Sequence, residues 1–97
     1  MLKIQLNNKE YIVETITAKA LKKVVAFKKK YAILQAQGDS EEELISEIVY
    51  FIVEVFNKQF TADDVWEYLP LNELNPVFNK TVDEIMAVFS NDDTKKK

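Results

Sequence analysis

The sequence predicts a mainly α protein, a small bundle of about four helices with an N-terminal β-hairpin. Its 97 residues, 47% of them apolar, suffice for one domain, expected at residues 1–90. Four segments place apolar residues three and four positions apart and begin at capping residues. Before them, residues 2–14 alternate apolar and polar side chains. Together these patterns favour helices packed on one face of a hairpin.

The stretch LKIQLNNKEYIVE, residues 2–14, is typical of two antiparallel strands joined by a tight turn. Asn7 and Asn8 tolerate the left-handed backbone that such a turn requires. A lone hairpin is barely stable in water, so its apolar face is expected to lie on helices. The side chains expected on that face are Leu2, Ile4 and Leu6, followed by either Tyr11 and Val13 or Ile12.

A first helix is expected at about residues 17–36, because apolar residues recur there every three or four positions while lysines occupy the opposite face. Gly38 follows this segment and can adopt a positive φ without steric cost, which is typical of a helix terminator. The apolar stripe consists of Ala20, Val24, Phe27, Tyr31 and Leu34, with Leu21 and Val25 beside it.

A second, central helix is expected at about residues 40–57. Ser40 and Glu43 form the S-x-x-E pattern of a capping box at its start. Most of the residues that follow are apolar, which predicts burial on most sides. The polar exceptions share one narrow stripe with a tyrosine: Glu43, Glu47, Tyr50 and Glu54.

Two further helices are expected at about residues 61–69 and 75–89. Thr61 is a typical N-cap for the first of them, and Pro70 ends it. Asn75 and Pro76 resemble a cap followed by proline at the first helical position. Residues 91–97 contain no apolar side chain and are expected to form a mobile charged tail.

The composition excludes several kinds of site. The chain has no His and no Cys, and no carboxylate, Ser, Thr, Tyr or Lys shows a catalytic spacing, so we expect no enzyme, no metal and no cofactor. All 13 cations are Lys, and without the planar fork of Arg specific nucleic-acid recognition is not expected. No apolar run reaches the roughly 20 residues of a membrane span, so a soluble protein is expected.

Charge is distributed unevenly along the chain. Residues 1–38 hold eight Lys and two Glu, a net charge of +6, whereas residues 39–97 hold five Lys and fourteen acids, a net charge of -9. Opposite charges of this kind can dock the first helix on the rest of the same molecule, or attract one molecule to the next. The sequence leaves both alternatives open.

Aromatic residues crowd the stretch FNKQFTADDVWEYLPLNEL, residues 56–74. A domain this small rarely hides every ring, and aromatic side chains beside a short helix make good anchors for a partner. Asp63 and Asp64 suit the first turn of a helix, where acids complement the dipole, and do not form an acid pair. The candidate partner-binding residues are Phe60, Trp66, Tyr68 and Leu69.

These features resemble one known family. The hairpin KIQLNNKEYIV, a Lys-rich helix, a central helix that runs into EVFNKQFTADDVWEYLPLNEL and a last amphipathic helix are similar to the tail assembly chaperones of long non-contractile-tailed phages and prophages of Gram-positive bacteria. The most particular element is the VF-x-x-x-FT-x-DD run at residues 55–64. In such proteins a glycine often follows the Asp-Asp helix, whereas Tyr68 and Leu69 occupy that place here.

The resemblance implies a non-enzymatic role in the cytoplasm of the bacterial host. Such chaperones bind the tape measure protein, keep it soluble until tail tube subunits polymerise around it, and are absent from the mature virion. The implied partners are the tape measure protein, further copies of the chaperone and the tail tube protein. Genes of this family often carry a slippery run near their end, on which some ribosomes shift frame and add a second domain, and consecutive lysine codons such as those for TKKK at residues 94–97 can supply that run of adenines.

Two alternatives stay open. Gly-Asp-Ser at residues 38–40 partly matches the Asp-Ser-Leu turn of small acidic carrier proteins, in which Ser40 would carry a phosphopantetheine arm, but Glu41 stands where the Leu belongs. The lysines of the first helix could instead contact DNA as an accessory protein, although the total charge of -3 disfavours it.

Overall fold

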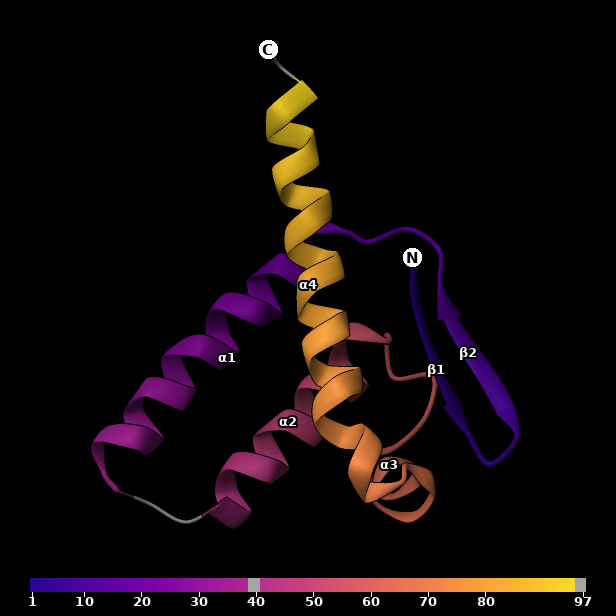
Figure 1. Cartoon of the computed structure of the whole chain (residues 1–97), viewed down its shortest axis with the longest axis vertical. Coiled ribbons are helices and arrows are strands. Elements are labelled where there is room, and N and C mark those ends of the chain that lie inside the picture. The colour runs from indigo at the N-terminus through magenta and orange to yellow at the C-terminus, as the bar shows by residue number, and fades with distance from the viewer. Residues whose placement is uncertain (39–40, 96–97) are drawn as a thin grey trace.

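The computed structural model describes residues 1–38 and 41–95, with the backbone alone at 91–95. Figure 1 shows a two-stranded sheet beside a set of helices, so the prediction of a mainly helical chain with an N-terminal hairpin is confirmed. The elements in chain order are β1 (Leu2–Leu6), β2 (Lys9–Val13), α1 (Ala18–Ala36), α2 (Glu41–Val55), α3 (Ala62–Tyr68) and α4 (Leu71–Lys95).

The hairpin is antiparallel and turns at the two asparagines. Asn7 and Asn8 have φ values of 52° and 63°, the positive angles that a two-residue hairpin turn of this kind needs. The register pairs Leu2 with Val13 and Ile4 with Tyr11 across the strands. Because directly opposite residues share a face of the sheet, Tyr11 and Val13 join the buried side and Ile12 is exposed.

Helices α1 and α2 form a helical hairpin that two ion pairs join. Gly38, with a φ of 64°, follows α1 as the expected terminator. The Lys23 ammonium lies 3.4 Å from a Glu54 carboxylate oxygen, and Lys30 lies 3.4 Å from Glu47 in the same way. The proposed cap Ser40 lies outside the described residues. These contacts support the alternative in which the basic first helix docks on the same molecule.

Helix α2 is the centre of the core, as its apolar sequence predicts. Ile52 and the following Phe56 have no exposed surface, and Phe56 contacts Phe60 with ring centroids 5.5 Å apart. The polar stripe of α2, which includes Glu47, Tyr50 and Glu54, lies on the least buried side of the helix. After α2 the side-chain amide of Gln59 donates a hydrogen bond of 3.0 Å to the carbonyl of Ile12, which ties this turn to the hairpin.

The short helix α3 begins with a complete capping box. The Thr61 hydroxyl accepts a bond from the Asp64 backbone N–H at 3.1 Å, and the Asp64 carboxylate accepts one from the Thr61 N–H at 3.0 Å. Two of the free N–H groups at the helix start are thereby satisfied. The predicted cap is confirmed, and the structure assigns Asp64 the second half of the box.

The last helix is longer than expected at both ends. It begins at Leu71 and contains Pro76 in its interior, so Asn75 and Pro76 do not start it. The packing of the partly buried Leu74 stabilises the first turn of this helix. This stabilisation outweighs the loss of the one backbone hydrogen bond that Pro76, which lacks an N–H, cannot donate. No Gly or Pro follows, and α4 continues past residue 90 to Lys95, into the stretch expected as a mobile tail.

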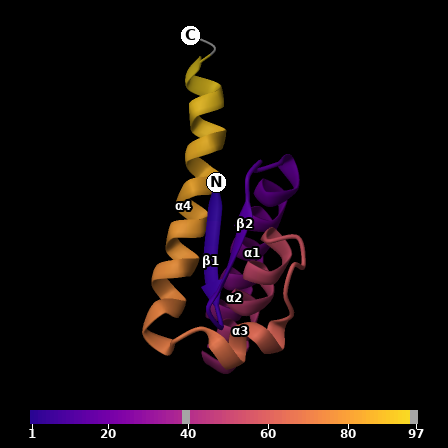
Figure 2. The same ribbon diagram turned by 90° about the vertical axis from the view of Figure 1, so that its right-hand side faces the viewer.

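The molecule is flat, with extents of 43 × 38 × 20 Å. Figure 2 shows α4 as a layer of its own on one side of the hairpin and the other helices. The core lies where the buried faces of β1, α2, α3 and α4 meet. The C-terminal turns of α4 project beyond the other elements (Figure 1). Val88 and Phe89, in the C-terminal half of α4, are exposed by 41% and 53%.

Candidate functional site

The four residues predicted to bind a partner occupy two different environments. Phe60 and Leu69 are buried, with 4% and 9% of their surface exposed, and the Phe60 ring meets the Tyr11 ring edge-on at 4.9 Å. Trp66 and Tyr68 are exposed by 50% and 43%. Two of the four therefore belong to the core, and two present surface to solvent.

Trp66 and Tyr68 do not form a common patch. Residues two positions apart on a helix point in directions about 200° apart. On one side of α3 the face between the two rings carries Val65 and Leu69, which are buried in the core. The short α3 thus exposes two separate rings. Contact of either ring with a partner stays a prediction.

A larger apolar feature lies between α1, α2 and α4. These helices leave a groove of about 400 Å³ that no described side chain fills, which we call the aromatic groove. Its walls and floor are formed by Val24, Phe27, Lys28 and Tyr31 of α1, Leu44, Ile48 and Phe51 of α2, and Asn75, Phe78, Asn79, Val82 and Asp83 of α4.

Three phenylalanines, one from each helix, contact one another in the lining of the aromatic groove. The centroid of the Phe27 ring lies 5.6 Å from that of Phe51 and 4.9 Å from that of Phe78, and Phe51 meets Phe78 at 5.3 Å. Tyr31 stacks on Phe27 at 6.1 Å and remains 41% exposed. Aromatic contacts at these distances are favourable and directional, so they hold the three helices in a fixed arrangement around the groove.

The α1 and α4 rims of the aromatic groove differ in charge. Lys28 lies on the α1 rim, and Asp83 lies on the α4 rim with the amides Asn75 and Asn79. Both charged residues are exposed, and neither takes part in an ion pair among the described residues. The groove is therefore apolar at its base, basic on one side and acidic on the other.

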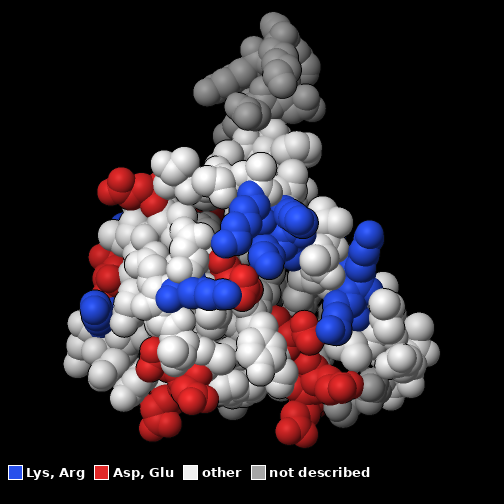
Figure 3. All heavy atoms as spheres, turned by 180° about the vertical axis from the view of Figure 1, so that it is seen from behind, with Lys and Arg blue, Asp and Glu red and all other residues white. Residues whose placement is uncertain are grey.

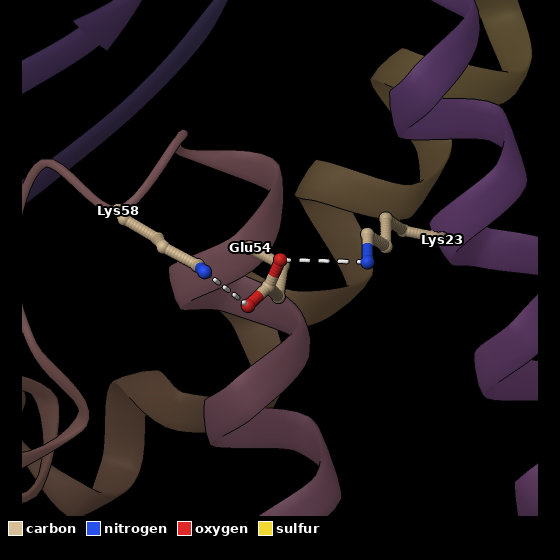
Figure 4. Close-up of polar contacts among 3 residues, drawn as sticks. All are labelled: Lys23, Glu54 and Lys58. Carbon is tan, nitrogen blue, oxygen red and sulfur yellow. Dashed lines mark ion pairs between the residues drawn. The ribbon is translucent and has the colours of Figure 1, made fainter.

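The other side of the α1–α2 pair is polar. Figure 3 shows Lys and acidic side chains in neighbouring clusters on the back of the molecule. Figure 4 shows Glu54 between Lys23 of α1 and Lys58, which follows α2 and whose ammonium lies 3.7 Å from the Glu54 carboxylate. Tyr50 lies in a shallow hollow beside the ion pairs and is 54% exposed. The ion pairs and the aromatic groove thus lie on different sides of the helix pair.

The described residues offer no metal site, since no group of three or more His, Cys, Asp or Glu side chains comes together among them. The alternative at Ser40 falls outside the described residues. What the arrangement can do is bind: an open apolar surface with charged rims is suited to another polypeptide.

The sequence did not single out the aromatic groove. Phe27, Phe51 and Phe78 belong to the apolar stretches of their helices, a pattern that predicts burial in the core. Their periodicity does not reveal that the three helices diverge around them. Tyr31 carries the one available signal, because a tyrosine in an apolar stripe often keeps its hydroxyl at the surface.

These features define a small helical protein with an open, aromatic-lined groove. The family described as "Phage tail chaperone protein" matches residues 1–97, and the chain belongs to this family. The predicted relationship to tail assembly chaperones is thereby confirmed. No curated protein and no solved structure matches the chain. None of the helices in the described part has the length and apolar character needed to cross a membrane.

Proposed function

We propose that this tail chaperone binds the tape measure protein of its phage and keeps it soluble until the tail tube polymerises around it. The observation that carries the proposal is an unfilled, aromatic-lined groove in a chain that belongs to the phage tail chaperone family. A role of this kind needs no catalysis. The family description suggests the same non-enzymatic role.

The physical basis is the binding of a helix in a groove. A long amphipathic helix exposes apolar side chains that aggregate in water, and a groove between helices can cover them. Tyr31 and the half-buried Phe78 offer ring surface for such contacts. A chaperone that binds at many places along one long chain also gains from avidity, so each single contact can be weak.

Further parts of the proposal concern location and partners. The chaperone would act in the cytoplasm of the bacterial host, be absent from the mature virion, and meet the tail tube protein during assembly. The exposed Val88 and Phe89 of α4 and the opposite charges of the two halves support association between copies. The longer frameshifted product requires an adenine-rich slippery heptamer at codons 95–97 and an overlapping downstream frame.

The test is co-expression of the chaperone with the tape measure protein of the same phage, scored by the soluble fraction of the latter. Wild-type chaperone should keep it soluble. Tyr31→Glu should abolish this effect, because it places a negative charge in the aromatic groove. Tyr31 is exposed and does not belong to the core, so the fold should tolerate this change. Tyr50→Glu is the matched control, because Tyr50 is similarly exposed but lies outside the groove.

Both variants should melt within a few degrees of the wild type, because each changes a side chain that is already about half exposed. Loss of solubilisation in Tyr31→Glu alone supports the groove as the binding site. Loss in Tyr50→Glu alone assigns binding to another surface. An insoluble tape measure protein beside the wild-type chaperone contradicts the proposed function itself.

A further inference from the structure

We infer that the aromatic groove recognises a helix whose two flanks carry opposite charges, acidic where it faces α1 and basic where it faces α4. This inference rests on the proposed function, because it names the chemistry of the segment that the groove takes. Two observations support it. The two rims carry opposite charges, and neither of these charged side chains takes part in the ion pairs that join the described residues.

The basic rim belongs to a helix with no acidic residue. Residues 18–36 contain six lysines, and two of them, Lys23 and Lys30, point to the far side and pair with α2. Lys28 is two positions before Lys30, which places it about 200° around the helix, on the side of the groove. Its ammonium therefore has no role in holding α1 to α2.

The acidic rim lies across the groove on α4. Asp83 lines the groove, while the next residue, Glu84, points elsewhere and pairs with the N-terminal amine at 3.5 Å. No ion pair joins Lys28 to Asp83 among the contacts of the described chain. The two rim charges thus do not neutralise each other, and both can meet a ligand placed between them.

The size of the groove fits a short length of helix. Its α4 wall runs from Asn75 to Asp83, eight residue steps or about 12 Å of helix, which corresponds to roughly two turns of a ligand lying alongside. Two turns place apolar residues at positions i, i+3 or i+4, and i+7 over the aromatic base, with one flank against each rim. Turning such a helix end for end exchanges its flanks, so the rim charges also select the direction in which it binds.

The test uses three synthetic helical peptides that share one leucine stripe. One carries Glu on one flank and Lys on the other, the second carries Glu on both flanks, and the third carries Lys on both. Calorimetric titration gives the Kd of each peptide for each chaperone variant. Wild type should bind the peptide with opposite flanks about two- to fivefold more tightly than either of the others.

Single charge reversals should change the preferred peptide. Lys28→Glu makes both rims acidic and should favour the peptide with Lys on both flanks. Asp83→Lys makes both rims basic and should favour the peptide with Glu on both flanks. The double reversal restores opposite rims and should restore the wild-type preference, with the peptide bound in the reverse direction.

Two control variants make the same changes in net charge away from the groove. Lys29→Glu and Glu73→Lys alter exposed residues that do not line it, and both should keep the wild-type order of affinities. An unchanged order in Lys28→Glu and Asp83→Lys overturns the inference. The inference also fails if the controls alter the order as much as the rim variants do, or if no peptide binds the wild type.

The experiment also separates this inference from the function on which it rests. If the peptides show no preference while the wild-type chaperone still keeps the tape measure protein soluble, the inference fails and the proposed function stands. If Lys28→Glu dissociates chaperone oligomers in sedimentation, with no peptide present, the groove belongs to a second copy and the stated occupant is wrong.

Discussion

Two adjacent residues after α2, Asn57 and Lys58, have φ values of 61° and 57°. Asparagine tolerates this left-handed conformation, but for lysine it costs free energy. The ion pair between Lys58 and Glu54 is largely exposed and too weak to enforce the turn. The buried rings of Phe56 and Phe60 on either side enforce it instead. The strain at Lys58 is thus maintained by tertiary packing.

Replacement of Lys58 by glycine should therefore stabilise the protein. Relative to Lys58→Ala, which also lacks the ion pair but keeps a Cβ atom, Lys58→Gly should raise the free energy of unfolding by about 0.5–1 kcal/mol. Equilibrium denaturation of both variants measures the difference. Equal stabilities would show that the backbone at this position is not strained.

At the residue scale, local chemistry made the turns and caps predictable. The Asn7–Asn8 turn, the Gly38 terminator and the Thr61 cap depend on side chains within a few positions of themselves. Exposure of Trp66 and burial of Phe60 depend on distant elements, and the sequence could not separate them.

At the scale of an element, α4 shows how one apolar stripe acquires two roles. Ile85 and Val88 are three positions apart and face the same side of the helix. Ile85 belongs to the core cluster and is 2% exposed, whereas Val88 lies outside that cluster and is 41% exposed. The periodicity that predicted the helix assigns both residues to one face and does not distinguish them.

Alanine substitutions in this stripe should therefore have unequal effects. Ile85→Ala should lower the free energy of unfolding by about 2–5 kcal/mol, because it leaves a cavity in the core. Val88→Ala should change it by about 0.5 kcal/mol or less. Chemical denaturation at low protein concentration measures both, and equal losses would mean that the end of α4 is covered in the folded monomer.

At the scale of the whole molecule, the opposite charges of the two halves act in part within the chain. Lys23 and Lys30 pair with acids of α2, but their side chains are 35% and 57% exposed, so each pair contributes little to stability. Outside the aromatic groove, Lys19, Lys22 and Lys29 of α1 form no ion pair among the described residues and face solvent. They are available to acidic surfaces of other molecules.

Association between copies should accordingly depend on concentration and on salt. The weight-average mass from sedimentation should rise with protein concentration and fall as sodium chloride screens the charges. Phe89→Glu should weaken the association by placing a charge beside the exposed Val88 of α4. A single monomeric species at every concentration would contradict this prediction.

The sequence by itself determined the class of the fold, the hairpin and its turn, and the helices and most of their boundaries, because periodicity, caps and turn residues act over a few positions. The resemblance, carried by the run at residues 55–64, also gave the family. Only the tertiary structure decided that Phe60 and Leu69 are buried, that α4 begins at Leu71, and that the rings of three helices line an open groove. Those outcomes depend on how helices far apart in sequence diverge and pack, because burial is set by all neighbours in space and not by the pattern within one element.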